Sequence, residues 1–391
     1  MLTGELEQTH LLPTYGPRTL MVERGRGCYL IDADGKNYLD FITGIGVNAL
    51  GYGHPRLLRE LHEQAALCIH TSNLYMHPFQ GELAARLKQW SGLDRVFFSN
   101  SGTEAMEAAL KAARARANQD GRRHQRIIAL ENGFHGRTAG ALAITGQAKY
   151  REPFQPLIPD VIFVPANDAP ALEAAANEDT IAIVAEPIQG EGGIFPLTTE
   201  FLAAIRRLTN QRDALYIADE TQCGLGRTGE RFAYQLHPTV APPDVVVTAK
   251  PLAGGLPLGA TIFSERAGEA ITKGLHGTTF GGGPLACRVA IAFLEEVEQL
   301  LPVIRQNGAY LHQRLRALQS ACPIVQEIRG HGLMAGIELA VPGEKYVEHA
   351  MQQGLLINCT HTNVLRLLPP YIIGPKEIDR ACAVLHKVLN A

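Results

Sequence analysis

The chain has 391 residues, of which 46% are hydrophobic and 19% are charged, and its formal net charge is −3. Such a balance lacks the concentrated basic surface that captures nucleic acid or an anionic membrane, so we predict neither as a partner. A chain of this length exceeds one ordinary hydrophobic core, and it predicts two packed units.

Cysteine usage and the first residues indicate the cellular compartment. The seven cysteines are scattered and contain no Cys-x-x-Cys pair, so neither a metal site nor a disulfide framework is predicted. The segment MLTGELEQTHLLPTYGP lacks the basic start and apolar run of a secretory signal. No stretch approaches the roughly 20 apolar residues that cross a bilayer. We therefore expect a cytoplasmic protein.

The predicted elements begin with an arm, in which YLIDADGKNYLDF indicates two short strands around the turn Asp34-Gly35. Seven short runs then alternate with helical stretches such as 102–117 and 199–210. Because these runs are apolar at successive residues, they predict strands buried on both faces, as in a mostly parallel sheet covered by helices. We predict an α/β fold. The runs are 95–100, 126–132, 160–167, 181–188, 214–220, 244–250 and 260–265.

A long helix is predicted from about residue 285, followed by a smaller α+β pattern with helices near 343–353 and from PKEIDR onward. This change of pattern divides the chain into three parts. We predict that residues 1–50 form an arm joining a small domain, that 51–285 form a large α/β domain, and that 286–391 form the small α+β domain.

Polar or glycine-rich turns follow five of the predicted strands. In an open parallel sheet the carboxyl ends of the strands share one edge, where ligands bind. We therefore expect a single site at that edge. The turns contain Ser101-Gly102-Thr103-Glu104, Phe134-His135-Gly136-Arg137-Thr138, Glu186 with Gly190-Glu191-Gly192-Gly193, Asp219-Glu220-Thr221-Gln222, and Lys250.

Ser101-Gly102-Thr103 opens a helix that is rich in Ala, Glu and Leu. A helix start offers unpaired N–H groups and the positive end of the helix dipole, so it can hold a phosphate. The same residues also fit a plain N-cap with an acidic first turn. The residues alone leave both interpretations open.

Asp219 and Lys250 each stand at the end of a predicted buried strand. A buried carboxylate beside a heterocycle nitrogen keeps that nitrogen protonated, but Asp219 could equally cap a turn. A lysine at such a position is either a neutral amine nucleophile or a side chain that reaches past the strand end to water. Pro251 restricts Lys250 to an extended backbone conformation.

Residues 224–229, GLGRTG, match the glycine pattern of dinucleotide-binding turns. That pattern needs a strand, the glycine turn and a helix in immediate succession. Three residues separate these glycines from their strand, and the following ERFAYQLHPTVAPPD makes a poor helix. A nicotinamide or flavin site is therefore not predicted here.

Seven ordered motifs resemble those of the class III (ornithine-type) aminotransferases of fold type I, and the resemblance covers essentially the whole chain. The motifs are SNSGTEAMEAALKAAR, NGFHGRTAGALAITG, AEPIQGEGG, ADETQCGLGRTG, the lysine of VTAK, HGTTFGG and LRLLPP. The resemblance implies a pyridoxal 5′-phosphate enzyme with a seven-stranded, mostly parallel sheet in its large domain. It assigns cofactor contacts to Ser101, Gly102, Thr103, Phe134, Asp219, Thr221, Gln222, Lys250 and Thr279.

The resemblance also implies a role for most of these positions. Gly102 and Thr103 would bind the phosphate, and Phe134 would stack on the pyridine ring. Asp219 would pair with the ring nitrogen, and Gln222 with the ring hydroxyl. Lys250 would carry the cofactor as a Schiff base and then act as the general base. Thr279 would reach the phosphate in the neighbouring subunit, which implies a homodimer with its active site at the subunit interface.

Substrate contacts follow from the same resemblance. Arg366 would bind the carboxylate of glutamate, and Glu191 would pair with Arg366 when a terminal-amine substrate occupies the site. A surface-facing strand arginine is the other interpretation of Arg366. Arg137 would bind the far carboxylate of the amine donor, with Thr278 nearby.

The segment GIGVNALGYGHP resembles the acetylornithine branch, because Gly44 and Ile45 stand about where the ornithine branch is expected to place a tyrosine. A small residue leaves room for an N-acyl group. We therefore expect transfer of the terminal amine of N2-acetylornithine to 2-oxoglutarate, in arginine biosynthesis. Succinylornithine, an acylated diaminopimelate precursor, carrier-bound lysine, ornithine and 4-aminobutyrate are alternative donors. A mutase or decarboxylase, or a protein that binds the cofactor without catalysis, is a more distant alternative.

Overall fold

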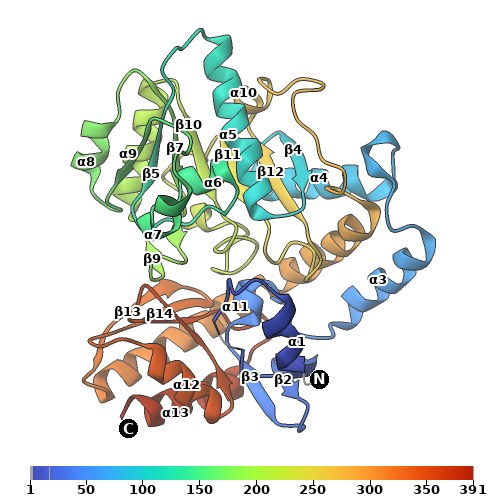
Figure 1. The fold of residues 1–391 in the computed structure, drawn as a ribbon, viewed down its shortest axis with the longest axis vertical. Helices are drawn as coiled ribbons and strands as arrows, with labels where there is room; N and C mark the ends of the chain where they lie inside the picture. The colour runs from blue at the N-terminus through green and yellow to red at the C-terminus, as the bar shows by residue number, and fades with distance from the viewer. Residues whose placement is uncertain (1–2, 17, 391) are drawn as a thin grey trace.

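A seven-stranded sheet occupies the upper half of the structure (Figure 1). In sheet order its strands are β4 (Arg95–Ser99), β12 (Gly259–Phe263), β11 (Val245–Thr248), β10 (Leu215–Asp219), β7 (Thr180–Ala185), β5 (Arg126–Leu130) and β6 (Val161–Val164). The pairs from β11 to β6 are parallel, whereas β12 is antiparallel to both of its neighbours. This computed structural model describes residues 3–16 and 18–390. Each predicted run forms one strand, so the α/β prediction is confirmed.

Helices cover both faces of this sheet, which explains why its strands are apolar at successive residues. Ile127 and Ala129 of β5 pack in a cluster with α5 (Gly102–Gln119). Ile128 and Leu130 point the other way and pack with α9 (Thr199–Gln211) and α8 (Ala169–Ala175). Alternate side chains of one strand therefore enter two different cores.

The lower half of the structure combines the two ends of the chain (Figure 1). One sheet, in the order β1-β2-β3-β15, joins three strands of the arm to a strand of the C-terminal part, and a second has the order β13-β14-β17-β16. The arm shares a sheet with the C-terminal part, while the division at residues 50 and 285 stays a prediction. These strands are β1 (Val22–Arg26), β2 (Tyr29–Asp32), β3 (Asn37–Asp40), β13 (Val325–His331), β14 (Met334–Leu339), β15 (Leu355–Leu356), β16 (Asn358–Thr360) and β17 (Val364–Leu367).

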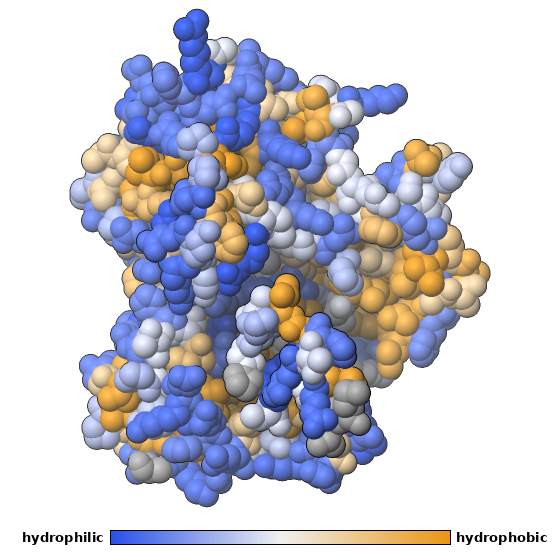
Figure 2. Space-filling model, in the orientation of Figure 1, coloured by the Kyte–Doolittle hydropathy of each residue, from blue (hydrophilic) through white to orange (hydrophobic). Residues whose placement is uncertain are grey.

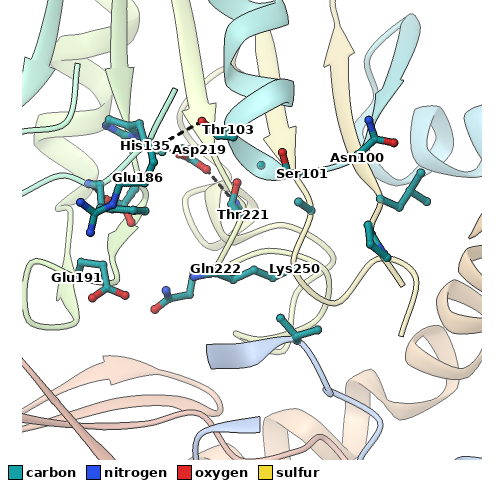
Figure 3. Close-up of a pocket in the computed structure, with 18 of the residues that line it drawn as sticks. Asn100, Ser101, Thr103, His135, Glu186, Glu191, Asp219, Thr221, Gln222 and Lys250 are labelled. Atoms are coloured by element: carbon teal, nitrogen blue, oxygen red, sulfur yellow. Dashed lines mark hydrogen bonds and ion pairs between the residues drawn. The ribbon is translucent and has the colours of Figure 1, made fainter. Parts of the chain in front are cut away.

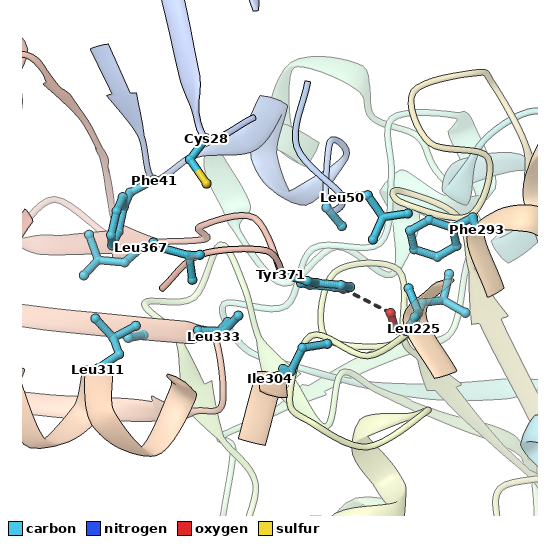
Figure 4. Packing of buried hydrophobic residues seen from close by; sticks show 14 of the residues in the cluster. Cys28, Phe41, Leu50, Leu225, Phe293, Ile304, Leu311, Leu333, Leu367 and Tyr371 are labelled. Carbon is cyan, nitrogen blue, oxygen red and sulfur yellow. Dashed lines mark hydrogen bonds between the residues drawn. The ribbon is translucent and has the colours of Figure 1, made fainter. Parts of the chain in front are cut away.

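The long helix α11 (Pro284–Ala321) links the two halves, as Figure 1 shows. Its buried Phe293 and Ile304 lie in the largest apolar cluster, together with Leu50 of the arm and Tyr371. The Tyr371 hydroxyl donates to the Leu225 carbonyl at 3.1 Å (Figure 4). This shared core fixes the C-terminal part against the loop that follows β10.

Further helices complete both halves, and short elements line the loops. Within residues 3–16 and 18–390, no helix is long and apolar enough to cross a membrane. The other elements are α1 (Thr3–His10), α2 (Thr43–Gly46), α3 (Pro55–Leu67), η1 (Ser72–Leu74), α4 (Pro78–Ser91), α6 (Ala139–Ala143), α7 (Ala148–Arg151), η2 (Glu152–Phe154), β8 (Ile188–Gln189), β9 (Phe195–Pro196), η3 (Ala233–Leu236), α10 (Glu265–Gly268), α12 (Glu344–Gln352) and α13 (Pro375–Leu389).

Candidate active site

A pocket of about 430 Å³ opens at the carboxyl ends of β4, β5, β7, β10 and β11, where the sequence places the site (Figure 3). Three of the thirteen predicted residues, Thr278, Thr279 and Arg366, do not line it. The ten that do are Ser101, Gly102, Thr103, Phe134, Arg137, Glu191, Asp219, Thr221, Gln222 and Lys250.

The start of α5 forms one wall of the pocket. Ser101 is the N-cap, and its Oγ accepts the N–H of Glu104 at 3.3 Å, while Glu104 Oε2 accepts the N–H of Asn100 at 2.6 Å. The plain N-cap interpretation is therefore correct. This N-cap still allows the helix start to bind an anion, because the N–H groups of Gly102 and Thr103 have no acceptor within the described residues.

Close backbone approaches hold the neighbouring loops against this helix start. A Cβ on Gly102 would lie 2.8 Å from Thr221 Cγ2, and one on Gly136 would lie 2.2 Å from Thr103 Oγ1. The same Thr103 hydroxyl oxygen accepts the N–H groups of Arg137 and Thr138, each at 3.2 Å. Glycine at these two positions lets the loops after β5 and β10 meet at the start of α5.

Asp219 is the centre of a buried polar network. Its Oδ1 accepts the N–H of Thr221 at 3.0 Å, and its Oδ2 lies 2.8 Å from Nδ1 of the buried His135. The other ring nitrogen of His135 is buried without a partner in the described residues. Burial alone would lower the pKa of His135, but Asp219 outweighs it and raises that pKa. His135 is therefore fit to hold Asp219 in place as an anion.

Glu186 extends this network toward two loops. Its carboxylate accepts the N–H of Phe134 at 2.9 Å and that of Gly190 at 3.0 Å. Burial raises the pKa of Glu186 to about 7. No role was predicted for His135 or Glu186 from the sequence. The signal that could have indicated such a role is that both are titratable residues near strand ends at the predicted site.

Lys250 lies two residues beyond the end of β11 at Thr248. The expectation that it ends the strand was therefore wrong, because the strand pairing stops at Thr248 and Lys250 begins the turn that follows. Its Nζ has no hydrogen-bond or ion-pair partner within the described chain, and its side chain lines the pocket (Figure 3). Burial and then the charge of Arg366 lower the pKa of Lys250 to about 8, although three carboxylates oppose this effect. An amine with this pKa is readily made neutral.

Arg366 comes from the opposite half of the structure and contacts two residues that line the pocket. It lies on β17 and is 1% exposed, so the surface-facing interpretation was wrong. Its Nη1 donates to Glu191 Oε1 at 2.5 Å and to Gln222 Oε1 at 3.2 Å. Burial alone would raise the pKa of Glu191, but Arg366 outweighs it and lowers that pKa. Glu191, whose side chain is 25% exposed, and the buried Arg366 therefore form an ion pair at the edge of the pocket.

The two threonines of HGTTFGG lie outside the pocket of their own chain. Thr278 Oγ1 accepts from Asn100 Nδ2 at 3.3 Å, which places it directly behind the pocket wall. Thr279 is exposed. Their roles toward the substrate and the neighbouring subunit stay predictions.

The glycines of GLGRTG have a packing role. No helix follows them directly, and a Cβ on Gly226 would lie 2.6 Å from Val297 of α11. The loop therefore approaches α11 closely.

A comparison with known families decides the class. The family model for aminotransferase class-III matches residues 13–389.

The chain belongs to the class III aminotransferases.

Similar proteins span nearly the whole of this class III chain. An acetylornithine aminotransferase of Aquifex aeolicus is 44% identical over 97% of this chain and 100% of its own length. The crystal structure of an N-acetylornithine aminotransferase from Stenotrophomonas maltophilia has a TM-score of 0.85 and 32% identity, covering 99% and 98% of the two chains. An ornithine aminotransferase of Toxoplasma gondii, whose structure is described with partial occupancy of pyridoxal phosphate at its active site, has a TM-score of 0.93 and 30% identity over 98% and 93%.

The cofactor of class III aminotransferases is pyridoxal 5′-phosphate, and the pocket offers a partner for its phosphate, its ring nitrogen and its aldehyde. Unpaired N–H groups at the start of α5 suit the phosphate, and the buried Asp219 suits a protonated ring nitrogen. The unpartnered amine of Lys250 suits the aldehyde. The residues present therefore fit this cofactor.

The lowered pKa of Lys250 leads to a testable pH dependence. Because only the neutral amine attacks an aldehyde, covalent loading of the apoprotein should rise with pH and reach half of its limiting rate near pH 8. Removing the cationic neighbour with Arg366→Gln should move this midpoint upward, since the protonated amine is then less disfavoured. Stopped-flow absorbance measures the rate. A midpoint near the ordinary lysine value of about 10.4, or a downward shift in the variant, would contradict the assignment.

Proposed function

We propose that the protein transfers the terminal amino group of N2-acetylornithine to 2-oxoglutarate, giving N-acetylglutamate 5-semialdehyde and glutamate in arginine biosynthesis. The ion pair between the buried Arg366 and the partly exposed Glu191 is the observation that carries the proposal. An enzyme that must accept glutamate at its α-amine and a second substrate at its terminal amine needs such a removable neutralising group. The similarity to the acetylornithine aminotransferase of Aquifex aeolicus supports acetylornithine as the donor.

When bound, the cofactor supplies an aldehyde that takes up amines and a ring that withdraws electrons from the neighbouring carbon. Gly102 and Thr103 would hold its phosphate, and Phe134 would lie against its ring. Asp219 would keep the ring nitrogen protonated, and Gln222 would pair with the ring hydroxyl. Lys250 would hold the cofactor through its amine, and its Nζ, when free, would accept the proton from the substrate carbon.

Two arginines recognise carboxylates in this proposal. Arg366 binds the α-carboxylate of glutamate after Glu191 moves aside, and Glu191 neutralises Arg366 again when the acylated donor enters. Arg137 binds the carboxylate of the donor from the other side of the pocket. Val47, in the segment that resembles the acetylornithine branch, lines the pocket and leaves room there for an acyl group.

Glu191→Gln tests this division of roles. The variant leaves Arg366 without its carboxylate partner, so the glutamate half-reaction should persist while the acetylornithine half-reaction slows by about tenfold or more, since an unpaired buried charge costs several kcal/mol. Single-turnover rates of the two half-reactions measure this effect. Glu200→Gln, at an exposed position of α9 that does not line the pocket, is a control. Equal slowing of both half-reactions would contradict the proposal that Glu191 neutralises Arg366 only when the acylated donor is bound.

We also propose that the active unit is a homodimer. Exposed apolar side chains gather between α3 and α4, where Leu74 and Met76 are 82% and 99% exposed, and nearby Phe280 is 67% exposed. His70 contacts Phe280 with ring centroids 5.1 Å apart, so the two segments form one surface beside Thr279. Figure 2 shows apolar residues on this flank over α3. Such a patch is typical of a protein interface. Sedimentation equilibrium at micromolar concentration would show a monomer if this proposal is wrong.

Initial rates with different donors test the proposed substrate most directly. Acetylornithine, succinylornithine, ornithine and 4-aminobutyrate should each be measured against 2-oxoglutarate. We expect the highest kcat/KM with acetylornithine. A higher value for free ornithine would instead place the chain with the ornithine aminotransferases that it also resembles in structure. The same assay can include an acylated diaminopimelate precursor and carrier-bound lysine.

A further inference from the structure

The two arginines at the pocket have opposite environments. Arg366 is buried against Glu191. Arg137 is exposed and lines the pocket, and within the described residues no carboxylate lies within ion-pair distance of it. A cation that must hold a fixed carboxylate in every turnover benefits from having no competing anion. A contact other than an ion pair must then define the position of the Arg137 side chain.

An aromatic ring supplies that contact. The Arg137 Cζ lies 3.9 Å from the ring centroid of Tyr150 on α7, and 5.4 Å from that of Phe134. The Tyr150 ring meets Phe134 edge to face, with centroids 6.1 Å apart and an interplanar angle of 84°. The guanidinium is therefore held by the ring of Phe134, which is proposed to cover the cofactor, and by the ring of Tyr150 from α7.

Stacking of a guanidinium on an aromatic face has a specific chemical consequence. The five N–H donors of arginine lie in the plane of the group, so a ring against its face leaves all of them free for a carboxylate. A partner carboxylate would fix the side chain too, but it would occupy those donors. Tyr150 thus restricts the rotamers of Arg137 without neutralising it.

We propose that Tyr150 is a positioning residue that holds Arg137 ready for the substrate carboxylate, so that Arg137 is a permanent anchor while Arg366 is a switched one. This inference rests on the proposed function for the role of Arg137. It adds a residue that we did not select from the sequence. It also explains why Arg137 needs no acidic partner in the pocket.

Lys149 provides a way to separate positioning from simple charge. Its Nζ lies 4.9 Å from the same ring centroid, it is exposed, and within the described residues it has no ion pair. Removing Lys149 takes away a positive charge near the pocket but leaves the Tyr150 ring in place. Removing the ring keeps both charges.

The test measures equilibrium binding of glutarate, a dicarboxylate without an amine, to the cofactor-loaded enzyme by calorimetry. Tyr150→Leu should weaken glutarate binding about three- to tenfold, as expected for loss of a partly exposed cation–π contact. Tyr150→Phe, which keeps the ring, should bind like the parent, and Lys149→Gln should change the affinity less than Tyr150→Leu. With acetylornithine, KM should rise in Tyr150→Leu with little change in kcat.

A double-mutant cycle makes the test decisive. In the Arg137→Gln background, Tyr150→Leu should have no further effect on glutarate binding. An equal loss in that background, or a loss in Tyr150→Phe equal to that in Tyr150→Leu, would overturn the proposal. If Tyr150→Leu fails to retain the cofactor, Tyr150→Met, which fills more of the ring volume, takes its place in the cycle. Failure of acetylornithine as a substrate, with the glutarate result intact, would refute the proposed donor and leave the role of Tyr150 standing.

Discussion

Replacing Lys250 with alanine is expected to abolish measurable transamination. The residue contributes both the amine that anchors the cofactor and the base that moves the substrate proton, and the base role alone is worth about 10²–10⁴-fold in rate. Its unpartnered Nζ in the pocket and its pKa of about 8 suit both tasks. Steady-state turnover of acetylornithine with saturating cofactor measures the loss.

Lys376→Ala is the matched control for this variant. Lys376 lies on α13 and is exposed, so its loss should leave turnover unchanged. Because Lys250 has no hydrogen-bond or ion-pair partner to lose within the described residues, and because burial disfavours its charged form, the alanine variant should not lower the melting temperature of the apoprotein. Full turnover by Lys250→Ala would refute the role given to this lysine.

Asp219→Asn is expected to reduce kcat by about 10²–10³-fold, comparable to the loss of one charge-stabilising group from an active site. An amide keeps the shape of the side chain but removes the negative charge that holds the ring nitrogen protonated. The contact at 2.8 Å with His135 supports that charge in the parent protein. Single-turnover rates with both amine donors should fall together, since Asp219 acts on the cofactor and not on one substrate.

A useful control for this substitution is Asp168→Asn. Asp168 caps α8, where its side chain accepts the N–H of Ala171 at 2.9 Å, and asparagine caps equally well. The turnover of the Asp168→Asn variant should match that of the parent protein. If Asp219→Asn kept the parent rate, Asp219 could not be the partner of the ring nitrogen.

Much of the fold was predictable because its signal is local. Strands buried on both faces need apolar residues at successive positions, and all seven runs became strands of one sheet. The edge at which Ser101, Phe134, Asp219 and Lys250 converge followed from the parallel order of these strands. Family motifs, rather than spacing, suggested Arg366, which arrives from a separate sheet.

Contacts between distant segments could not be predicted from the sequence. Nothing local indicates that His135 meets Asp219 or that Glu186 accepts N–H groups from two loops, because these pairs form only when the strands assemble. The stacking of Tyr150 on Arg137 depends on the turn of α7 in the same way. Lys250 was misplaced by two residues because an apolar run does not show where the strand hydrogen bonds stop.

The central claim is that the turns at one sheet edge surround a single cofactor attached at residue 250. Borohydride reduction of the pyridoxal 5′-phosphate-loaded enzyme, followed by peptide mapping with mass spectrometry, tests this attachment directly. We expect one phosphopyridoxyl adduct per chain, on Lys250. An adduct on another lysine, or spread over several exposed lysines, would contradict it.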